Sequence, residues 1–151
     1  MDLDTAVGIG TLVAVLTGLV FGATQVQMTA RRRKAETTAQ LITSFLDTDI
    51  KRAYPIIRAL PDDCDPAVIR RDPETRTAAE SMDMFFEAHG MLVDRGVLQL
   101  GEVEKAIGGA ARMSWRKLRA YVAAERQASG NARYGEWFEW LVERLDAAVG
   151  R

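Results

Sequence analysis

Three aspartates within four positions, Asp62, Asp63 and Asp65, are the residues whose spacing comes nearest to a metal site. Clustered carboxylates can bind Ca²⁺, but the twelve-residue calcium loop also requires a central glycine and a final glutamate, and that pattern is absent. Asp65 and Asp72 each precede a proline, which is typical of an N-cap residue followed by proline at the first helical position. We therefore interpret these aspartates as caps and turn residues and expect no bound metal.

The other residues able to do chemistry are isolated. His89, the only histidine, has no Glu-x-x-His pair around it of the kind that holds two metal ions in helical bundles, so we expect a hydrogen-bonded residue at the core edge. Gly108-Gly109 lacks the preceding strand and following Gly-Lys-Ser/Thr of a phosphate loop, and we interpret it as a helix break. Without a nucleophile–base pair, metal cluster or phosphate loop, we predict a protein that is not an enzyme and has no cofactor. A hydrolase that uses Asp62, Asp63 or Glu87 ranks last among the alternatives.

Helices must position these residues, because no strand-like alternation or hairpin turn occurs in the sequence. We predict an all-α fold with one N-terminal transmembrane helix followed by a small cytoplasmic helical bundle. Pro55 lies inside a helical pattern and is expected to kink or divide it. The predicted soluble helices span residues 35–46, 49–60, one turn between 66 and 72, 74–95, 97–107, 110–129 and 134–149.

The helix predicted at 74–95 has the clearest periodicity, and Gly96 is expected to end it. An apolar face and an acidic face lie on different sides of this helix. The apolar face consists of Ala78, Met82, Phe85, Phe86, His89, Leu92 and Val93. The acidic face consists of Glu80, Asp83, Glu87 and Asp94.

A row of cations follows the helix predicted at 110–129, with Lys117 beside it. This row is open to three interpretations: it is solvated, it meets the acidic face inside the domain, or it binds a protein partner, acidic lipid or RNA. Trp140 falls off the apolar stripe of the last helix and is either an interface residue or a tryptophan at the core edge. The candidate partner surface therefore consists of Arg112, Arg116, Arg119, Arg126 and Trp140.

The N-terminal segment has a different character. No charged side chain occurs from Thr5 to Ala30, and Arg31, Arg32, Arg33 and Lys34 follow at once. About 20 apolar residues of helix span a bilayer, and the positive-inside rule keeps the basic cluster, which also contacts lipid headgroups, in the cytoplasm. We predict a single-pass protein of the inner membrane with its N-terminus outside, an anchor at 1–34 and a cytoplasmic domain at 35–151. A cleaved signal peptide and a buried soluble helix are the alternatives.

Small residues recur at every fourth position of the predicted span, and the last two form a GxxxG pair. Such residues let two helices approach closely in lipid, which favours a homo-oligomer or packing against a partner span. The alternative is that glycine and alanine are simply frequent in such helices. The repeated residues are Ala6, Gly10, Ala14, Gly18 and Gly22.

Composition excludes some partners of the domain. The 151-residue chain has a formal net charge of −1, and the 16 basic and 19 acidic side chains from Ala35 onward give that part a charge of −3. General nucleic-acid binding needs a basic footprint, so we expect no nucleic-acid partner. Cys64 is the only cysteine, which excludes an intramolecular disulfide and fits a reducing compartment.

The order of these features resembles a family of small bacterial proteins of unknown function, in which one N-terminal span precedes a helical domain. A mid-chain helix ending in Leu-Val-x-x-Gly, a Trp-bearing helix leading to an Arg, and an aromatic-rich last helix are common to both. The matching residues, between Ala35 and Leu145, are Leu92, Val93, Gly96, Trp115, Arg126, Tyr134 and Phe138. The resemblance implies architecture and no activity. It also implies that Trp115 and Arg126 are structural anchors, the arginine holding helix-end carbonyls or a carboxylate.

The sequence is consistent with two functions. The first is a membrane-anchored interaction module, a scaffold or accessory subunit that self-associates or binds a partner. The second is a small-ligand or lipid sensor, with a pocket formed by the methionines, Phe85 and the tryptophans of the domain. The methionines of this expected pocket are Met82, Met84 and Met91.

Overall fold

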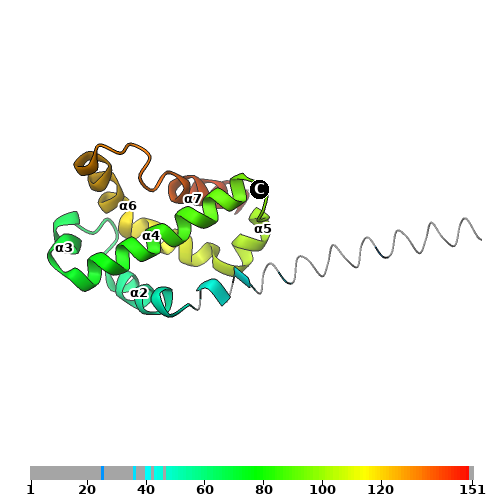
Figure 1. The fold of residues 1–151 in the computed structure, drawn as a ribbon, viewed down its shortest axis with the longest axis horizontal. Helices are drawn as coiled ribbons and strands as arrows, with labels where there is room; N and C mark the ends of the chain where they lie inside the picture. The colour runs from blue at the N-terminus through cyan, green and yellow to red at the C-terminus, as the bar shows by residue number, and fades with distance from the viewer. Residues whose placement is uncertain (1–24, 26–35, 37–39, 42, 46, 150–151) are drawn as a thin grey trace, which may run out of the picture. The chain divides into compact units, whose positions relative to one another are not determined.

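The longest described helix, α4, runs from Pro73 to Asp94 and contacts α2, α3, α6 and α7. The computed structural model describes residues 25, 36, 40–41, 43–45 and 47–149, and the helices belong to one compact unit, Thr37–Arg151. In Figure 1, α4 lies between α2 and α7. The elements in chain order are α2 (Thr48–Ala59), α3 (Pro66–Arg71), α4 (Pro73–Asp94), α5 (Leu100–Val103), the π-helix η1 (Glu104–Gly108), α6 (Gly109–Ser129) and α7 (Glu136–Val149).

Aspartate caps begin three of these helices, α2, α3 and α4. Asp47 accepts a hydrogen bond from the Asp49 amide at 3.2 Å, and Asp65 accepts one from the Ala67 amide at 2.8 Å. Asp72 likewise accepts one from the backbone amide three residues later at 2.9 Å. Each bond satisfies an amide that has no partner within its own helix. The predicted roles of Asp65-Pro66 and Asp72-Pro73 are therefore confirmed.

Gly96 ends α4, as predicted. Its φ of 68° lies in the left-handed region, which side chains rarely adopt. The turned chain lets the Gly96 amide donate to the Val93 carbonyl at 3.0 Å and the Val97 amide donate to the Leu92 carbonyl at 2.9 Å. These bonds satisfy the last carbonyls of the helix.

Pro55 does not divide α2, so the second of the two expected effects, a kink or a division, does not occur. The helix is continuous from Thr48 to Ala59, and Pro55 is exposed on its surface. Proline removes one intrahelical hydrogen bond. Ala53 and Ile57, on either side of it, are buried at 3% and 0% exposure, and such tertiary packing supplies most of the stability of a protein helix.

Gly108-Gly109 is not a helix break, and this prediction is wrong. Both glycines have helical dihedral angles, and the chain remains helical from α5 through η1 into α6. A Cβ on Gly108 would lie 2.6 Å from the Glu104 Oε2 atom, so glycine makes room for this carboxylate. A π-turn inserts an extra residue without ending a helix.

The core of the described domain collects residues from every helix. Phe86 stacks on Phe138 with ring centroids 4.7 Å apart, and Trp115 meets Phe138 edge-on at 5.0 Å. The apolar face predicted for α4 is confirmed in outline, with four members buried and the other three half-buried. The buried members are Ala78, Met82, Phe85 and Phe86.

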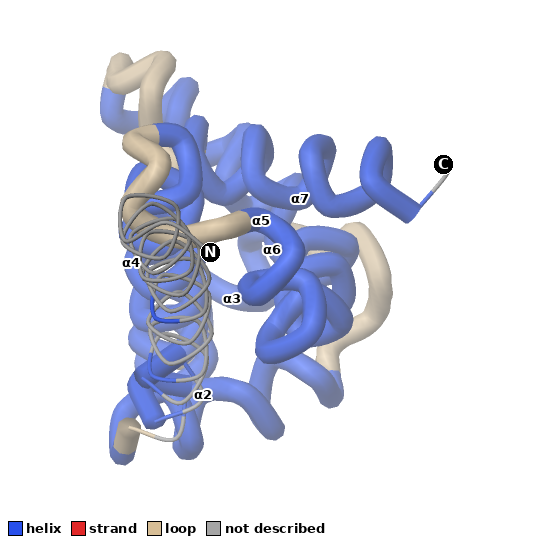
Figure 2. The backbone as a smooth tube through the Cα atoms, turned by 90° about the vertical axis from the view of Figure 1, so that its right-hand side faces the viewer, coloured by secondary structure: helices blue, strands red, loops and turns tan. Residues whose placement is uncertain are grey.

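All regular elements of the described residues are helices, as the all-α prediction requires, and Figure 2 shows no strand in this part of the chain. Among these helices none combines the length and apolar character needed to cross a membrane. The predicted span and basic stop lie, except for Gln25, outside the described residues. The positions concerned are Ala6, Gly10, Ala14, Gly18, Gly22, Arg31, Arg32, Arg33 and Lys34.

Candidate functional site

Asp83 is the main departure from the acidic face predicted for α4. Its side chain is 4% exposed, and Oδ1 has no hydrogen-bond partner among the described residues. Gly135, in the turn before α7, packs over this carboxylate: a Cβ there would lie 3.0 Å from Oδ1 and 2.7 Å from the Val122 Cγ1 atom. The positive φ of Gly135, 66°, also favours glycine. Asp83 is therefore enclosed between α4, α6 and the turn before α7.

Glu87 lies one turn further along α4 and connects it to α7. Its Oε2 atom accepts hydrogen bonds from the backbone amides of Trp137 at 2.9 Å and Phe138 at 2.8 Å. These amides belong to the first turn of α7, where helical N–H groups have no intrahelical partner and the helix dipole favours negative charge. Glu87 thus caps a helix that begins 49 residues after it in sequence, and it does not belong to a solvated face.

The environment raises the pKa values of both carboxyl groups. Burial raises the pKa of Asp83 from 3.8 to about 7, and the charge of Glu87 adds to this effect, while Tyr134 and Arg126 oppose it. Burial also raises the pKa of Glu87, although the amides of Phe138 and Trp137 lower it. The pair can therefore hold a proton close to neutral pH.

Arg126, from α6, connects α6 to the turn before α7 and to α7 itself. Its Nε atom donates to the Tyr134 carbonyl at 2.7 Å, and its guanidinium donates to Glu139 at 2.8 Å. Burial, followed by the charge of Asp83, raises the pKa of the Tyr134 hydroxyl. The structure therefore gives Arg126 the anchoring role implied by the family resemblance, because it holds both a carbonyl and a carboxylate.

The arrangement of Asp83 and Glu87 suits proton binding and helix docking, because Asp83 is enclosed and Glu87 accepts two backbone amides of α7. In the part of the chain that the structure describes, no group of three His, Cys, Asp or Glu residues is placed to hold a metal ion. The Cys64 thiol is buried at 1% exposure, and burial raises its pKa, so the nucleophilic thiolate is disfavoured. His89 is also confirmed as a core-edge residue, with Nδ1 2.7 Å from the Phe85 carbonyl oxygen and burial lowering its pKa.

The cations of α6 form ion pairs within the domain, but their partners are not those of the predicted acidic face. Arg112 pairs with Glu104 at 2.8 Å and with Asp146 at 2.6 Å. It also donates to the Leu145 carbonyl at 2.8 Å. Its side chain is only 21% exposed. Arg112 therefore joins η1, α6 and α7 within the domain.

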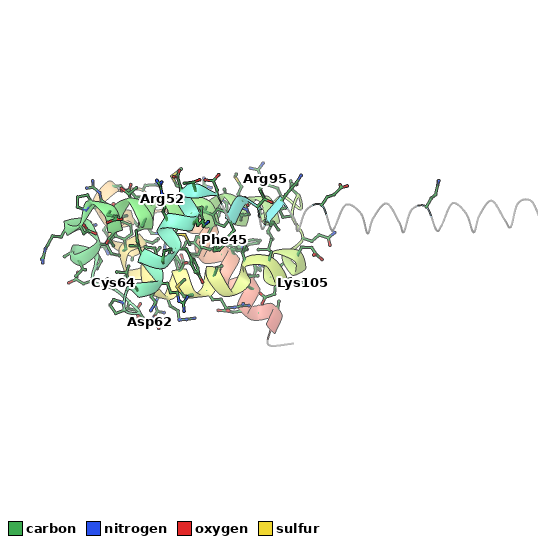
Figure 3. The ribbon with its side chains drawn as sticks, turned by 90° about the horizontal axis from the view of Figure 1, so that it is seen from below. Phe45, Arg52, Asp62, Cys64, Arg95 and Lys105 are labelled. Atoms are coloured by element: carbon green, nitrogen blue, oxygen red, sulfur yellow. The ribbon has the colours of Figure 1, made fainter. Side chains whose placement is uncertain are left out.

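Asp62 and Asp63 are the partners of the middle of the cation row, and turn chemistry alone does not account for them. Asp62 lies 2.7 Å from the Lys117 ammonium and 3.5 Å from the Arg116 guanidinium, and Asp63 pairs with Arg119. Lys117 and Arg119 hold the pKa values of Asp62 and Asp63, respectively, below their usual range. Figure 3 places Asp62 and Cys64 at the end of the domain opposite Arg95 and Lys105.

Trp140 lies at the core edge, which agrees with the second of its two interpretations, a tryptophan at the core edge. It is half-buried and packs against the core cluster. Its ring centroid is 5.8 Å from that of Trp137, and the Arg144 guanidinium carbon lies 5.3 Å above it.

The methionines of the sensor hypothesis do not form one pocket. Met82 is fully buried, whereas Met84 is 71% exposed and Met91 is 39% exposed. A groove of about 370 Å³ lies instead between α2 and α4. It is lined by Asp49, Arg52, Ala53, Ile56, Glu74, Thr77, Ala78 and Ser81.

The fold and site define a class: a small all-helical domain whose longest described helix presents one buried and one half-buried carboxyl group to the start of the last helix. A family model described as "Domain of unknown function (DUF4760)" matches residues 6–145, so the chain belongs to that family. The expectation of a family of unknown function is thereby confirmed. No curated protein and no solved structure matches the chain.

Sequence reasoning missed the pairing of Asp83 with Glu87. The available signal was an aspartate and a glutamate one turn apart, followed by Gly90 on the same side of the helix. A small residue beside two acids indicates that another element approaches there closely. The approaching element is α7, since a Cβ on Gly90 would lie 2.1 Å from the Trp137 carbonyl oxygen.

Proposed function

We propose that the protein is a non-enzymatic interaction module anchored in the inner membrane by one N-terminal helix, with its helical domain in the cytoplasm. The observation that carries this proposal is the charge-free segment from Thr5 to Ala30, followed directly by four cations. The segment is long enough to span a bilayer as a helix, and the cations favour the cytoplasmic side. The module is a scaffold or accessory subunit in a membrane assembly.

The charges of the domain support a binding role and narrow its partner surface. Arg112 and Arg126, at 21% and 24% side-chain exposure, are internal anchors. Arg116 and Arg119 are 53% and 54% exposed, and their acidic partners are about as exposed. Exposed ion pairs contribute little to stability, so Arg116 and Arg119 can exchange their aspartates for acidic groups of a partner protein at small cost.

Membrane anchorage is tested by fractionation. Membranes that contain the full-length protein are washed at alkaline pH, which releases peripheral proteins, and the pellet and supernatant are compared. We expect the protein in the pellet and a C-terminal reporter on the cytoplasmic side. Replacing Arg31, Arg32, Arg33 and Lys34 by glutamine should weaken this orientation, because the charge bias is removed. Full-length protein in the supernatant would contradict the proposal.

Self-association is tested within the same span. Leucine at Gly18 and Gly22 should lower association in a membrane oligomerisation assay, because the larger side chains prevent close helix approach. Gly8→Leu is the matched control, since Gly8 lies outside the four-residue repeat. Unchanged association of the Gly18 and Gly22 variant, or equal loss in the control, would argue against packing through this face.

A small-ligand or lipid sensor is the second candidate, and the groove between α2 and α4 favours it. Its volume of about 370 Å³ falls within the range of small-molecule sites. Asp49, Arg52 and Glu74 line it, and none of them forms an ion pair within the described part of the chain. Native mass spectrometry of protein purified from its host separates the two candidates: a retained protein supports the module, and a retained small molecule supports the sensor.

A further inference from the structure

We propose that Asp83 and Glu87 form a proton-binding site that controls the docking of α7 on α4. One proton on Asp83, beside the ionised Glu87, keeps the start of α7 in place, and its loss loosens that contact. This inference concerns the described helical domain alone and does not depend on membrane anchorage.

The burial of Asp83 is the first step. Oδ1 is enclosed, with no hydrogen-bond partner among the described residues. Ionising a carboxyl group that has one unpartnered oxygen is costly in a dry site, even though Tyr134 hydrogen-bonds to the Asp83 carboxyl group, whereas the neutral form is tolerated. The packing of Gly135 over Oδ1 leaves no room for a larger residue there. The enclosed geometry therefore fits the protonated form of Asp83.

The hydrogen bonds of Glu87 determine which residue holds the proton. Glu87 Oε2 accepts from both the Trp137 and Phe138 amides, and an acceptor of two amide bonds at a helix N-terminus is stabilised as an anion. The proton therefore resides on Asp83, and Glu87 keeps its negative charge. When Asp83 also ionises, two negative charges one helical turn apart lie against the same end of α7.

Among the described residues, no cation near the pair is free to neutralise the second charge. Arg133, from the turn before α7, acts on Glu87 but already pairs with Glu136. Arg126, from α6, is the cation that acts on both carboxyl groups, and it already binds the Tyr134 carbonyl and Glu139. Glu136, from α7, adds a further negative charge beside Glu87. Tyr134, from the turn before α7, stabilises the ionised form of Asp83 only in part, because burial has the larger effect on the Asp83 pKa.

The size of the effect follows from proton linkage. The pKa of Asp83 is about 7 in the docked state, and exposure to water on undocking returns it towards its ordinary value near 4. Between about pH 6 and pH 8, the docking equilibrium should weaken about tenfold, because the undocked state is fully ionised over this range.

The test is hydrogen exchange of the Trp137 and Phe138 amides in the full-length protein, corrected for the intrinsic pH dependence of exchange. Protection of both amides should fall about tenfold between about pH 6 and pH 8. In Asp83→Asn the fall should disappear, because the side chain no longer ionises. Asp94→Asn and His89→Gln, on the same helix, are the controls and should keep the wild-type fall.

Carboxyl NMR titration of Asp83 in the wild-type protein keeps the proposal testable even if Asp83→Asn does not fold. A midpoint near 7 supports the proposal, and one near the ordinary value for aspartate overturns it. The proposal is also overturned if Asp83→Asn folds and retains the wild-type fall in protection, or if wild-type protection does not change with pH.

Discussion

The carboxylate of Glu87, in the C-terminal half of α4, accepts a hydrogen bond from the backbone amide of Trp137 at 2.9 Å, 50 residues later in the chain. A helix usually receives its N-terminal cap from the residue just before it. Here the capping carboxylate comes from another helix, so the start of α7 is stabilised only when α7 is docked on α4. The same hydrogen bonds therefore cap α7 and hold it against α4.

Glu87→Ala should lower the free energy of unfolding by about 1–3 kcal/mol, because two amides lose a charged acceptor. Glu87→Gln keeps one acceptor oxygen and should lose less. Urea denaturation near neutral pH measures both variants. Glu80→Ala is the control, since Glu80 is 51% exposed and its ion pair with Arg76 is 3.9 Å long; it should change stability by less than about 0.5 kcal/mol. Equal losses in the Glu87 and Glu80 alanine variants would contradict this account of the cap.

Asp83 should make the domain less stable as the pH rises. Its folded-state pKa, about 7, is raised from 3.8, so the folded state retains a proton that the unfolded state releases between about pH 4 and pH 7. The stabilisation is complete below about pH 4, is lost up to about pH 7 and stays lost above it, amounting to at most about 4 kcal/mol.

Asp83→Asn removes this pH dependence and should therefore be more stable relative to wild type at about pH 8 than at about pH 4. Urea denaturation of both proteins at the two pH values measures the difference. Other carboxylates cancel in this comparison because both proteins contain them. A difference in stability that is the same at both pH values would contradict the raised pKa of Asp83.

The local signals of the sequence predicted the helices and most of their ends. Asp65-Pro66, Asp72-Pro73 and Gly96 act through their own backbone neighbours, so a sequence window contains all the relevant information. Gly108-Gly109 misled because glycine serves two purposes: it can end a helix, or it can make room for a neighbour. The room it makes here is for Glu104, and only the fold reveals that.

The pairing of Asp83 with Glu87 could not be predicted either, because it also depends on neighbours that only the fold brings close. Asp83 and Glu87 have the spacing of a solvated helix face, and charged residues usually face water. Asp83 is enclosed by α6 and the turn before α7, and Glu87 is partly covered by the start of α7, about 50 residues away in sequence. The ion pairs of α6 show the same limit: a cation row and several acids are visible in the sequence, but pairing Arg119 with Asp63 requires the tertiary fold.

Arg126 and Arg116 should differ sharply when truncated, although both belong to the cation row of α6. Arg126→Ala removes bonds to the Tyr134 carbonyl and Glu139 at a partly buried position, so we expect a loss of about 2–3 kcal/mol. Arg116→Ala removes an exposed 3.5 Å contact with Asp62 and should cost less than about 0.5 kcal/mol. Thermal or urea denaturation measures both, and similar losses would show that Arg126 is not an anchor.

Gly90 and Gly109 provide the most direct test of how α4 and α7 pack. A Cβ at position 90 would lie 2.1 Å from the Trp137 carbonyl oxygen and 2.7 Å from its carbonyl carbon. Backbone atoms cannot rotate away as the end of a side chain can, so α7 as a whole must shift. Gly90→Ala should therefore cost at least about 1–3 kcal/mol.

Gly109→Ala is the matched control for this substitution. Nothing lies within 4 Å of a Cβ at position 109, and its φ of −62° suits alanine. The variant should be more stable than wild type by about 0.5–1 kcal/mol, because alanine loses less conformational entropy in a helix. Urea denaturation should thus move the two variants in opposite directions. If Gly90→Ala were instead stabilising, α7 would not approach α4 this closely, and the enclosure of Asp83 that depends on this approach would be wrong as well.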